Sequence, residues 1–224
     1  SNNLMTNSAG TFSYGIDLSS LANATIFNNT IENAQTYGIR LTTTHSTIIR
    51  NNTLSSNTND LNIRTSSNYT QIIDTIINGY SITDNIYYLS LENTTTGKIL
   101  YLSNISGTGT KLWGTAGADI LVRNNSAFVN SSRNGALNRS ANITLYGLGW
   151  ATTPNIYADW NDDATYDEKC IAPTCYNLSY SSGTFVFNTT HFTEYITGTN
   201  MAPYASQYFV NSSAGTNYTD ENLN

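Results

Sequence analysis

Short apolar stretches recur in the first third of the chain with a period of about 22 to 23 residues. The stretch YGIDL at residues 14–18 returns as YGIRL at residues 37–41 and, more loosely, as DLNIR at residues 60–64. A second apolar stretch repeats in the same register, as IFNNTI at residues 26–31, IRNNTL at residues 49–54 and IIDTII at residues 72–77. Each repeat therefore predicts two short strands separated by polar turns.

A repeat of this kind predicts a right-handed parallel β-helix over residues 1–85. One coil cannot bury its inward Ile and Leu side chains alone, but coils stacked about 4.8 Å apart pair their strands and close a continuous core. Three coils make only a short rod, so we expect further coils before residue 1. Polar residues also stack in this register, Asn28 over Asn51 over Asp74, and Asn29 over Asn52 over Thr75. We expect these ladders to stabilise the turns.

The regular period is lost after Tyr80, and longer strand-like runs follow, such as GKILYLS, ANITLYGL and GTFVFNTTHFTEYITG. Runs of this length, separated by Gly, Asn and Ser turns, predict a β-sandwich over residues 86–200. Residues 201–224 contain two more strand candidates, SQYFVNSS and NYTDENLN. This tail has three interpretations: it is donated to a sheet edge of a neighbouring copy, folds back on its own sandwich, or begins an immunoglobulin-like repeat.

Composition supports this interpretation and argues against disorder. Asn, Ser and Thr supply 32, 24 and 34 of the 224 residues, and only 11% of residues are charged. Disordered chains combine low hydrophobicity with high net charge and few aromatic residues, whereas this chain has 12% aromatic residues and frequent Ile and Leu. The predicted fold class is all-β, with the C-terminal coils of a right-handed parallel β-helix followed by a β-sandwich.

The charge balance excludes several classes of partner. A net charge of −6 with nine Lys and Arg residues leaves no basic patch for nucleic acid or for an anionic membrane. The sequence has no run of 18 apolar residues and no charged-then-apolar leader. We therefore expect no membrane span and no retained signal peptide in these 224 residues.

The two cysteines, Cys170 and Cys175, flank four residues in the segment CIAPTC. A local disulfide is the preferred interpretation, because two thiolates with no further Cys or His nearby cannot close a tetrahedral zinc site. A metal pair is the alternative. A disulfide implies an oxidising compartment, so we expect a secreted chain at the cell surface.

Sequons for N-glycosylation are frequent, although the Ser and Thr content alone accounts for more than half of them. The fourteen candidates are Asn23, Asn28, Asn51, Asn68, Asn93, Asn104, Asn124, Asn130, Asn138, Asn142, Asn177, Asn188, Asn211 and Asn217. We expect several of them to be glycosylated in a secreted chain.

The segment DWNDDATYDE has the alternating oxygen ligands of a calcium loop. Positions 1, 3, 5, 7 and 9 of this loop are Asp159, Asn161, Asp163, Thr165 and Asp167. The segment departs from the EF-hand pattern, because Ala164 replaces the glycine at position 6 and Cys170 stands where a bidentate Glu belongs. Glu168 would have to substitute. The alternatives are a structural Ca²⁺ site and an acidic, solvated hairpin tip.

Residues suited to catalysis do not converge in the sequence. His191 lies in an alternating strand-like run and is interpreted as a hydrogen-bonded structural residue, and His45 as exposed in a polar turn. Asp17 aligns with Arg40 on the next coil, where the two form an outward ion pair rather than an acidic cluster. General acid and base catalysis requires ionisable groups that meet at one bond, so we expect no enzyme activity in this chain.

The segments AFVNSSRNGALNRSANITLYGL and FNTTHFTEYITG, with the aspartate-rich cysteine segment between them, resemble a module of archaeal secreted and cell-surface proteins. The resemblance covers residues 86–198. In that family the module follows parallel β-helix coils of the NosD-like, copper-periplasmic-protein and carbohydrate-binding type, and immunoglobulin-like repeats often come next. Residues 201–224 look like the opening of such a repeat. The resemblance implies a cell-surface location and says little about biochemical activity.

Three functions are compatible with these features. The leading one is a structural subunit of an archaeal extracellular surface layer or filament, whose partners are other copies of the same chain joined by strand addition or stacking. The second is an adhesin, in which exposed aromatic residues would bind surface glycans. The third is a truncated β-helix enzyme that acts on polysaccharides, with its site in coils upstream of residue 1.

Overall fold

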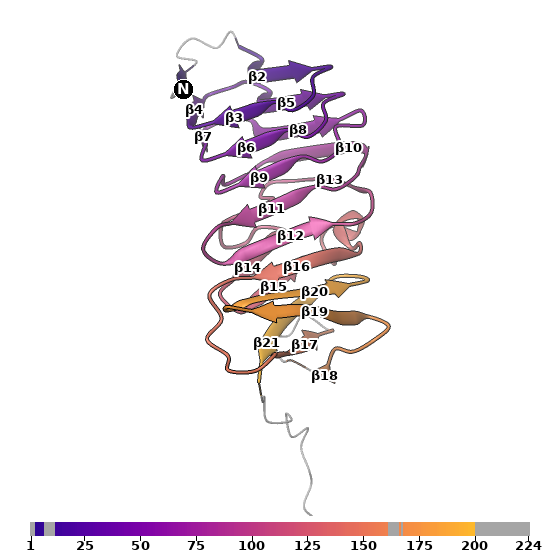
Figure 1. The fold of residues 1–224 in the computed structure, drawn as a ribbon. Helices are drawn as coiled ribbons and strands as arrows, with labels where there is room; N and C mark the ends of the chain where they lie inside the picture. The colour runs from indigo at the N-terminus through magenta and orange to yellow at the C-terminus, as the bar shows by residue number, and fades with distance from the viewer. Residues whose placement is uncertain (1–2, 7–11, 161–165, 167, 200–224) are drawn as a thin grey trace, which may run out of the picture.

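The structure is a computed structural model that describes residues 3–6, 12–160, 166 and 168–199. These residues form β-strands joined by turns, with one short 3₁₀ helix, η1 (Gly135–Leu137). Figure 1 shows the strands stacked along one axis, with β2 near one end and β18 near the other. The prediction of an all-β chain is confirmed.

The N-terminal strands form a parallel solenoid. Its successive coils contain β1 (Asn3–Thr6); β2 (Tyr14–Ser19), β3 (Thr25–Phe27) and β4 (Asn29–Glu32); β5 (Tyr37–Thr42), β6 (Ile48–Arg50) and β7 (Thr53–Ser55); β8 (Asn59–Arg64) and β9 (Gln71–Ile73); and β10 (Tyr80–Ile86) and β11 (Ser90–Asn93). Where successive coils have equivalent strands, these strands pair in parallel, which gives three sheets around one core. The apolar repeat explains this arrangement, because Ile39 and Leu41 of β5 and Leu61 and Ile63 of β8 are buried at the same inward positions of successive coils.

The strand register confirms the predicted repeat and extends it by one coil. Ile16 pairs with Ile39, and Ile39 pairs with Leu61, so both steps follow the spacing of the sequence repeat. Leu61 then pairs with Tyr80, and this step is shorter. Parallel pairing thus continues past Tyr80, where the sequence period is lost. The step is shorter because this coil has no strand after β9 that would correspond to β4 and β7. In its place, Ile77 makes one isolated β-bridge, with Trp113.

The corners of the coils are occupied by stacked residues in the left-handed region. Asn28, Asn51 and Asp74 have φ values of 58°, 52° and 45°. Asn and Asp adopt this conformation more readily than other residues with a side chain, which suits them to a repeated corner. These three residues therefore stack, as predicted, at the positions where the backbone of each coil bends.

The neighbouring ladder is buried and hydrogen-bonded from coil to coil. The backbone N–H and the side-chain amide of Asn29 donate to Oδ1 of Asn52, at 2.9 and 3.0 Å. The backbone N–H of Asn52 donates to Oγ1 of Thr75 at 3.1 Å. These bonds satisfy polar groups at a turn that faces the core.

The remaining strands continue the solenoid sheets in antiparallel pairing. They are β12 (Gly97–Tyr101), β13 (Ile105–Gly109), β14 (Ile120–Arg123), β15 (Ser126–Val129), β16 (Ala141–Leu145), β17 (Asn155–Asp159), β18 (Glu168–Lys169), β19 (Cys175–Ser181), β20 (Thr184–Thr189) and β21 (Glu194–Gly198). One sheet has the order β19-β20-β16-β12-β11-β9-β6-β3, a second runs β13-β10-β8-β5-β2, and a third, β14-β15-β21-β17-β18, lies wholly after the coils.

A single apolar core runs through both parts of the molecule. It includes Ile39 and Leu61 of the coils, Tyr101 of β12 and Phe187 of β20, all fully buried. β10 also crosses residues 85 and 86, where the sequence predicted a boundary. The division into a β-helix at residues 1–85 and a β-sandwich at residues 86–200 stays a prediction. The tail at residues 201–224 lies outside the described residues.

Candidate functional site

The predicted calcium loop is described only at its margins. Asp159 ends β17 and is buried, whereas Asn161, Asp163, Thr165 and Asp167 lie outside the described residues. Within the described part of the chain, no three His, Cys, Asp or Glu residues form a group that could hold a metal ion. The calcium site stays a prediction.

The strands beside this loop add a carboxylate that the sequence spacing did not indicate. Glu194 of β21 lies directly opposite Asp159 in the antiparallel register, and its Oε1 accepts a 2.6 Å bond from Arg123. Burial raises the pKa of Tyr166, and the charges of Glu194 and Asp159 raise it further. Glu194 could not be assigned to this site from sequence, because it joins Asp159 only through a strand pairing between distant parts of the chain.

A disulfide closes the chain after the loop. Cys170 and Cys175 are bonded, with their Cα atoms 5.6 Å apart, as the sequence predicted. Near the start of the loop, the indole N–H of Trp160 donates to Oε1 of Glu168 at 2.9 Å. Glu168, proposed from sequence as a substitute calcium ligand, is exposed and accepts this hydrogen bond from Trp160.

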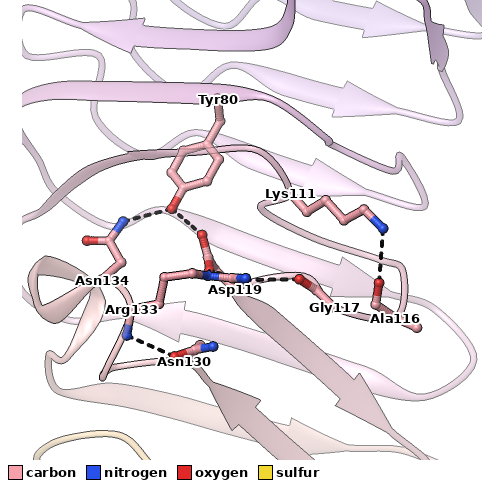
Figure 2. A network of polar contacts seen from close by, with 8 residues as sticks. All are labelled: Tyr80, Lys111, Ala116, Gly117, Asp119, Asn130, Arg133 and Asn134. Carbon is pink, nitrogen blue, oxygen red and sulfur yellow. Dashed lines mark hydrogen bonds and ion pairs between the residues drawn. The ribbon is translucent and has the colours of Figure 1, made fainter.

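A buried polar network joins the last parallel coil to the strands that follow. Figure 2 shows Tyr80, Asp119, Arg133 and Asn134 converging from β10, from the residue before β14 and from the turn before η1. Tyr80 donates to Oδ2 of Asp119 at 2.7 Å and accepts from the Asn134 amide at 2.8 Å. Arg133 donates from Nε to Oδ1 of Asp119 at 2.5 Å. Gly109 leaves room for this contact, since a Cβ there would lie 2.6 Å from the Tyr80 ring and 2.8 Å from Asp119.

This network has a structural role. Only 2% of the Asp119 side chain is exposed, and its carboxylate is satisfied by Tyr80 and Arg133. Burial and, next, the hydrogen bond to Asp119 raise the pKa of Tyr80, so its phenol keeps its proton at neutral pH. A carboxylate enclosed in this way cannot reach a substrate.

The sequence predicted the position of one histidine but not of the other, because the run that contains His191 is divided: His191 lies in the bend between β20 and β21 and not within a strand. His45 is exposed in its turn, and Nδ1 of His191 lies 3.1 Å from Oγ1 of Thr190. The ring of His191 packs against Trp160 with centroids 5.4 Å apart. The expected pair of Asp17 and Arg40 also forms, with Nε of Arg40 2.9 Å from Oδ1 of Asp17.

The eight-stranded sheet ends in strands that, among the described residues, each pair on one side only. β3 pairs with β6 and β19 pairs with β20. These edges lie toward opposite ends of the stack in Figure 1. Large apolar side chains are exposed in the segments that contain these edges, namely Phe12, Leu21 and Phe27 in the segment of β2 and β3, and Ile171, Tyr176 and Leu178 near β19. A register shift between Asn177 and Ser179 interrupts the β19 ladder at Leu178.

Twelve of the fourteen sequon asparagines fall within the described residues, and none of the twelve is buried. Asn23, Asn51, Asn124 and Asn177 are the exposed ones. The other eight are half-buried, namely Asn28, Asn68, Asn93, Asn104, Asn130, Asn138, Asn142 and Asn188. Asn211 and Asn217 lie outside the described residues. Glycosylation stays a prediction.

A groove on the outer face of the eight-stranded sheet was not indicated by the sequence. It has a volume of about 290 Å³ and is lined by Tyr69, Gln71, Tyr88, Ser90, Lys98 and Leu100, a set named here the tyrosine groove. These residues come from three adjacent strands and two corners, so only the strand pairing brings them together.

Comparison with known proteins adds no functional information. No protein-family model, no curated protein and no solved structure matches this chain. No helix within the described residues is long and apolar enough to cross a membrane. The fold that the structure supports is an all-β solenoid of about three turns whose sheets continue into antiparallel strands.

Proposed function

We propose that this chain is a structural subunit of an extracellular surface layer or filament, in which copies join through the edges of their sheets. The observation that carries the proposal is the eight-stranded sheet, whose end strands β3 and β19 lie at opposite ends of the molecule. An unpaired edge offers backbone N–H and C=O groups to another strand. A contact between unlike ends is heterologous, and repeated contacts of this kind generate a filament unless the rotation between copies closes a ring.

The tail at residues 201–224 is the proposed donor of the added strand. An isolated pair of strands is marginal in water, so the SQYFVNSS segment gains most by joining an existing sheet. In the copy that would receive this strand, β19 is divided into residues 175–177 and 179–181 by the register shift at Leu178. Among the described residues, both parts pair only with β20, so their other edge is unpaired. Exposed Tyr176 and Leu178 would be covered by the added strand.

An extracellular setting is supported by two further features. The Cys170–Cys175 disulfide fits an oxidising compartment. The resemblance of residues 86–198 to archaeal secreted β-helix proteins points to the same location. We assign no catalysis to the chain, and four acidic side chains of the described residues have separate local partners: Asp17 with Arg40, Asp60 with Asn78, Asp74 with Thr94, and Asp119 with Arg133.

We also propose that the loop beginning at Asp159 holds one structural Ca²⁺, with Asn161, Asp163, Thr165 and Asp167 as the other ligands. The buried Asp159 and the opposing Glu194, which also pairs with Arg123, supply two carboxylates beside this loop, and Ca²⁺ binds carboxylate oxygens. Removal of calcium with EGTA should lower the melting temperature, and added Ca²⁺ should restore it. An unchanged melting temperature contradicts the calcium site and leaves the filament proposal intact.

Edge variants test the filament proposal. Tyr176→Lys and Leu178→Lys place charges on the β19 edge, and Thr144→Lys places the same charge on β16, which is paired on both sides. We expect the edge variants to lose polymers in negative-stain electron microscopy while the Thr144→Lys control polymerises like the original chain. Deletion of residues 201–224 should also leave a folded monomer. Polymers of unchanged length in the edge variants and in the deletion contradict the proposal.

A further inference from the structure

The tyrosine groove has a rigid aromatic wall. Tyr69 and Tyr88 lie on successive coils, and their rings stack with centroids 4.7 Å apart and an interplanar angle of 10°. This spacing matches the separation of about 4.8 Å between paired strands, so the backbone itself holds the rings in register. The side chains remain 52% and 37% exposed.

The fold does not by itself explain tyrosine at these two corners. Tyr69 and Tyr88 have φ values of 59° and 57°, the same left-handed conformation that Asn23 and Ser46 adopt at the equivalent corners of the two preceding coils. A bulky residue tolerates this conformation less well than Asn. Stacking offsets part of that strain, but small polar residues would fill both corners without it. Exposed aromatic side chains kept in a strained backbone point to a role outside folding.

The floor of the groove carries free polar groups. Gln71 of β9, Ser90 of β11 and Lys98 of β12 lie on the side of the sheet opposite Ile72, Leu91 and Ile99. Gln71 is exposed, Lys98 is half-buried, and Ser90 is only 6% exposed. The side-chain polar groups of the three outward residues make no hydrogen bond or ion pair within the described part of the chain. The same holds for the hydroxyl groups of the two tyrosines.

The charge of the groove selects among possible ligands. Lys98 is the one charged side chain among the six lining residues. The carboxylate of Glu92, opposite Lys98 in the register of β11 and β12, does not line the groove and accepts a hydrogen bond from Tyr146. This positive group lies on a chain whose net charge is −6. A ligand with a negative group would pair with Lys98 through a charge-assisted hydrogen bond.

We propose that the tyrosine groove binds a glycan that carries carboxylate groups. The apolar face of a sugar ring would pack on the tyrosine wall, its hydroxyl groups would bond to Gln71 and Ser90, and a carboxylate would pair with Lys98. The groove volume of about 290 Å³ lies just below the range of ligand pockets, roughly 300–1,000 Å³, and suits a short stretch of saccharide rather than a folded partner. This site is independent of the sheet edges used in the proposed assembly.

Calorimetric titration of the unglycosylated chain tests this site. The probes are trigalacturonate and the neutral galactose trisaccharide with the same linkage. We expect trigalacturonate to bind at least about tenfold more tightly, and Lys98→Gln to remove that preference while Lys98→Arg retains it. The double variant Tyr69→Asn and Tyr88→Ser gives both corners the residue types of Asn23 and Ser46. It should keep or raise the melting temperature and weaken binding at least about tenfold.

Tyr87→Ser is the matched control, because Tyr87 is an exposed neighbouring tyrosine that does not line the groove. Its binding should equal that of the original chain. Three results overturn the proposal: no heat with trigalacturonate, equal binding by the double variant, or equal binding of a tetraglutamate peptide, which would show that the groove recognises charge alone.

Discussion

Asp119 keeps a carboxylate inside the protein because segments far apart in the sequence supply its partners. Tyr80 donates from 39 residues before it, and Arg133 pairs with it from 14 residues after it. By contrast, the hydroxyl group of Tyr101 is buried without a hydrogen-bond partner among the described residues. Both tyrosines are thus buried, but only Tyr80 makes hydrogen bonds among the described residues, so the two offer a matched comparison.

Tyr80→Phe should destabilise the protein by about 1–3 kcal/mol, because it leaves buried groups of Asp119 and Asn134 unpaired. Tyr101→Phe should be neutral or slightly stabilising, because it removes a hydroxyl that makes no bond. Urea unfolding of both variants measures the difference. Equal destabilisation by the two substitutions would contradict the assigned roles.

At the scale of the elements, the coil corners depend on asparagine side chains as much as on apolar repeats. The Asn52 amide donates to the carbonyl groups of Ile26 and Arg50 and accepts from Asn29, so it connects two coils. Asn52→Ala should therefore lower the free energy of unfolding by about 2 kcal/mol or more. The control is Asn124→Ala at an exposed turn, which should change it by no more than about 0.5 kcal/mol. Similar effects at both positions would show that the ladder adds nothing to stability.

The elements also show how far the sequence could predict the structure. The coils were predictable because equivalent residues such as Ile39 and Leu61 are buried in the same register on successive coils, so apolar residues recur at a regular spacing in the sequence. The last coil was missed because its step from Leu61 to Tyr80 is shorter than the sequence repeat. The Asp119 network and the tyrosine groove were missed because strand pairing, which leaves no local signal, brings their residues together.

At the scale of the whole molecule, the coils and the later strands share two sheets and one core. Unfolding of either part would expose the paired edges of the other. We therefore predict a single cooperative transition, with tryptophan fluorescence from Trp113, Trp150 and Trp160 and far-ultraviolet circular dichroism changing together. Two separate transitions would show that residues 1–85 and 86–200 are independent units.

The same continuity gives the molecule two different ends, and the assembly proposal depends on them. β3 lies in the parallel coils and β19 beside the disulfide, so an end-to-end contact would join unlike strands of one sheet. The tyrosine groove lies on β9, β11 and β12, between β3 and β19 in the order of that sheet, so contacts at the two edges would leave it open.

Electron cryotomography of the cells that produce this protein, with the chain located by antibody labelling, tests whether copies assemble outside the cell. We expect filaments or a continuous layer, in which neighbouring copies contact each other through the β19 end. Labelled protein that is dispersed as single copies at the cell surface, or found inside the cell, would contradict the proposed assembly.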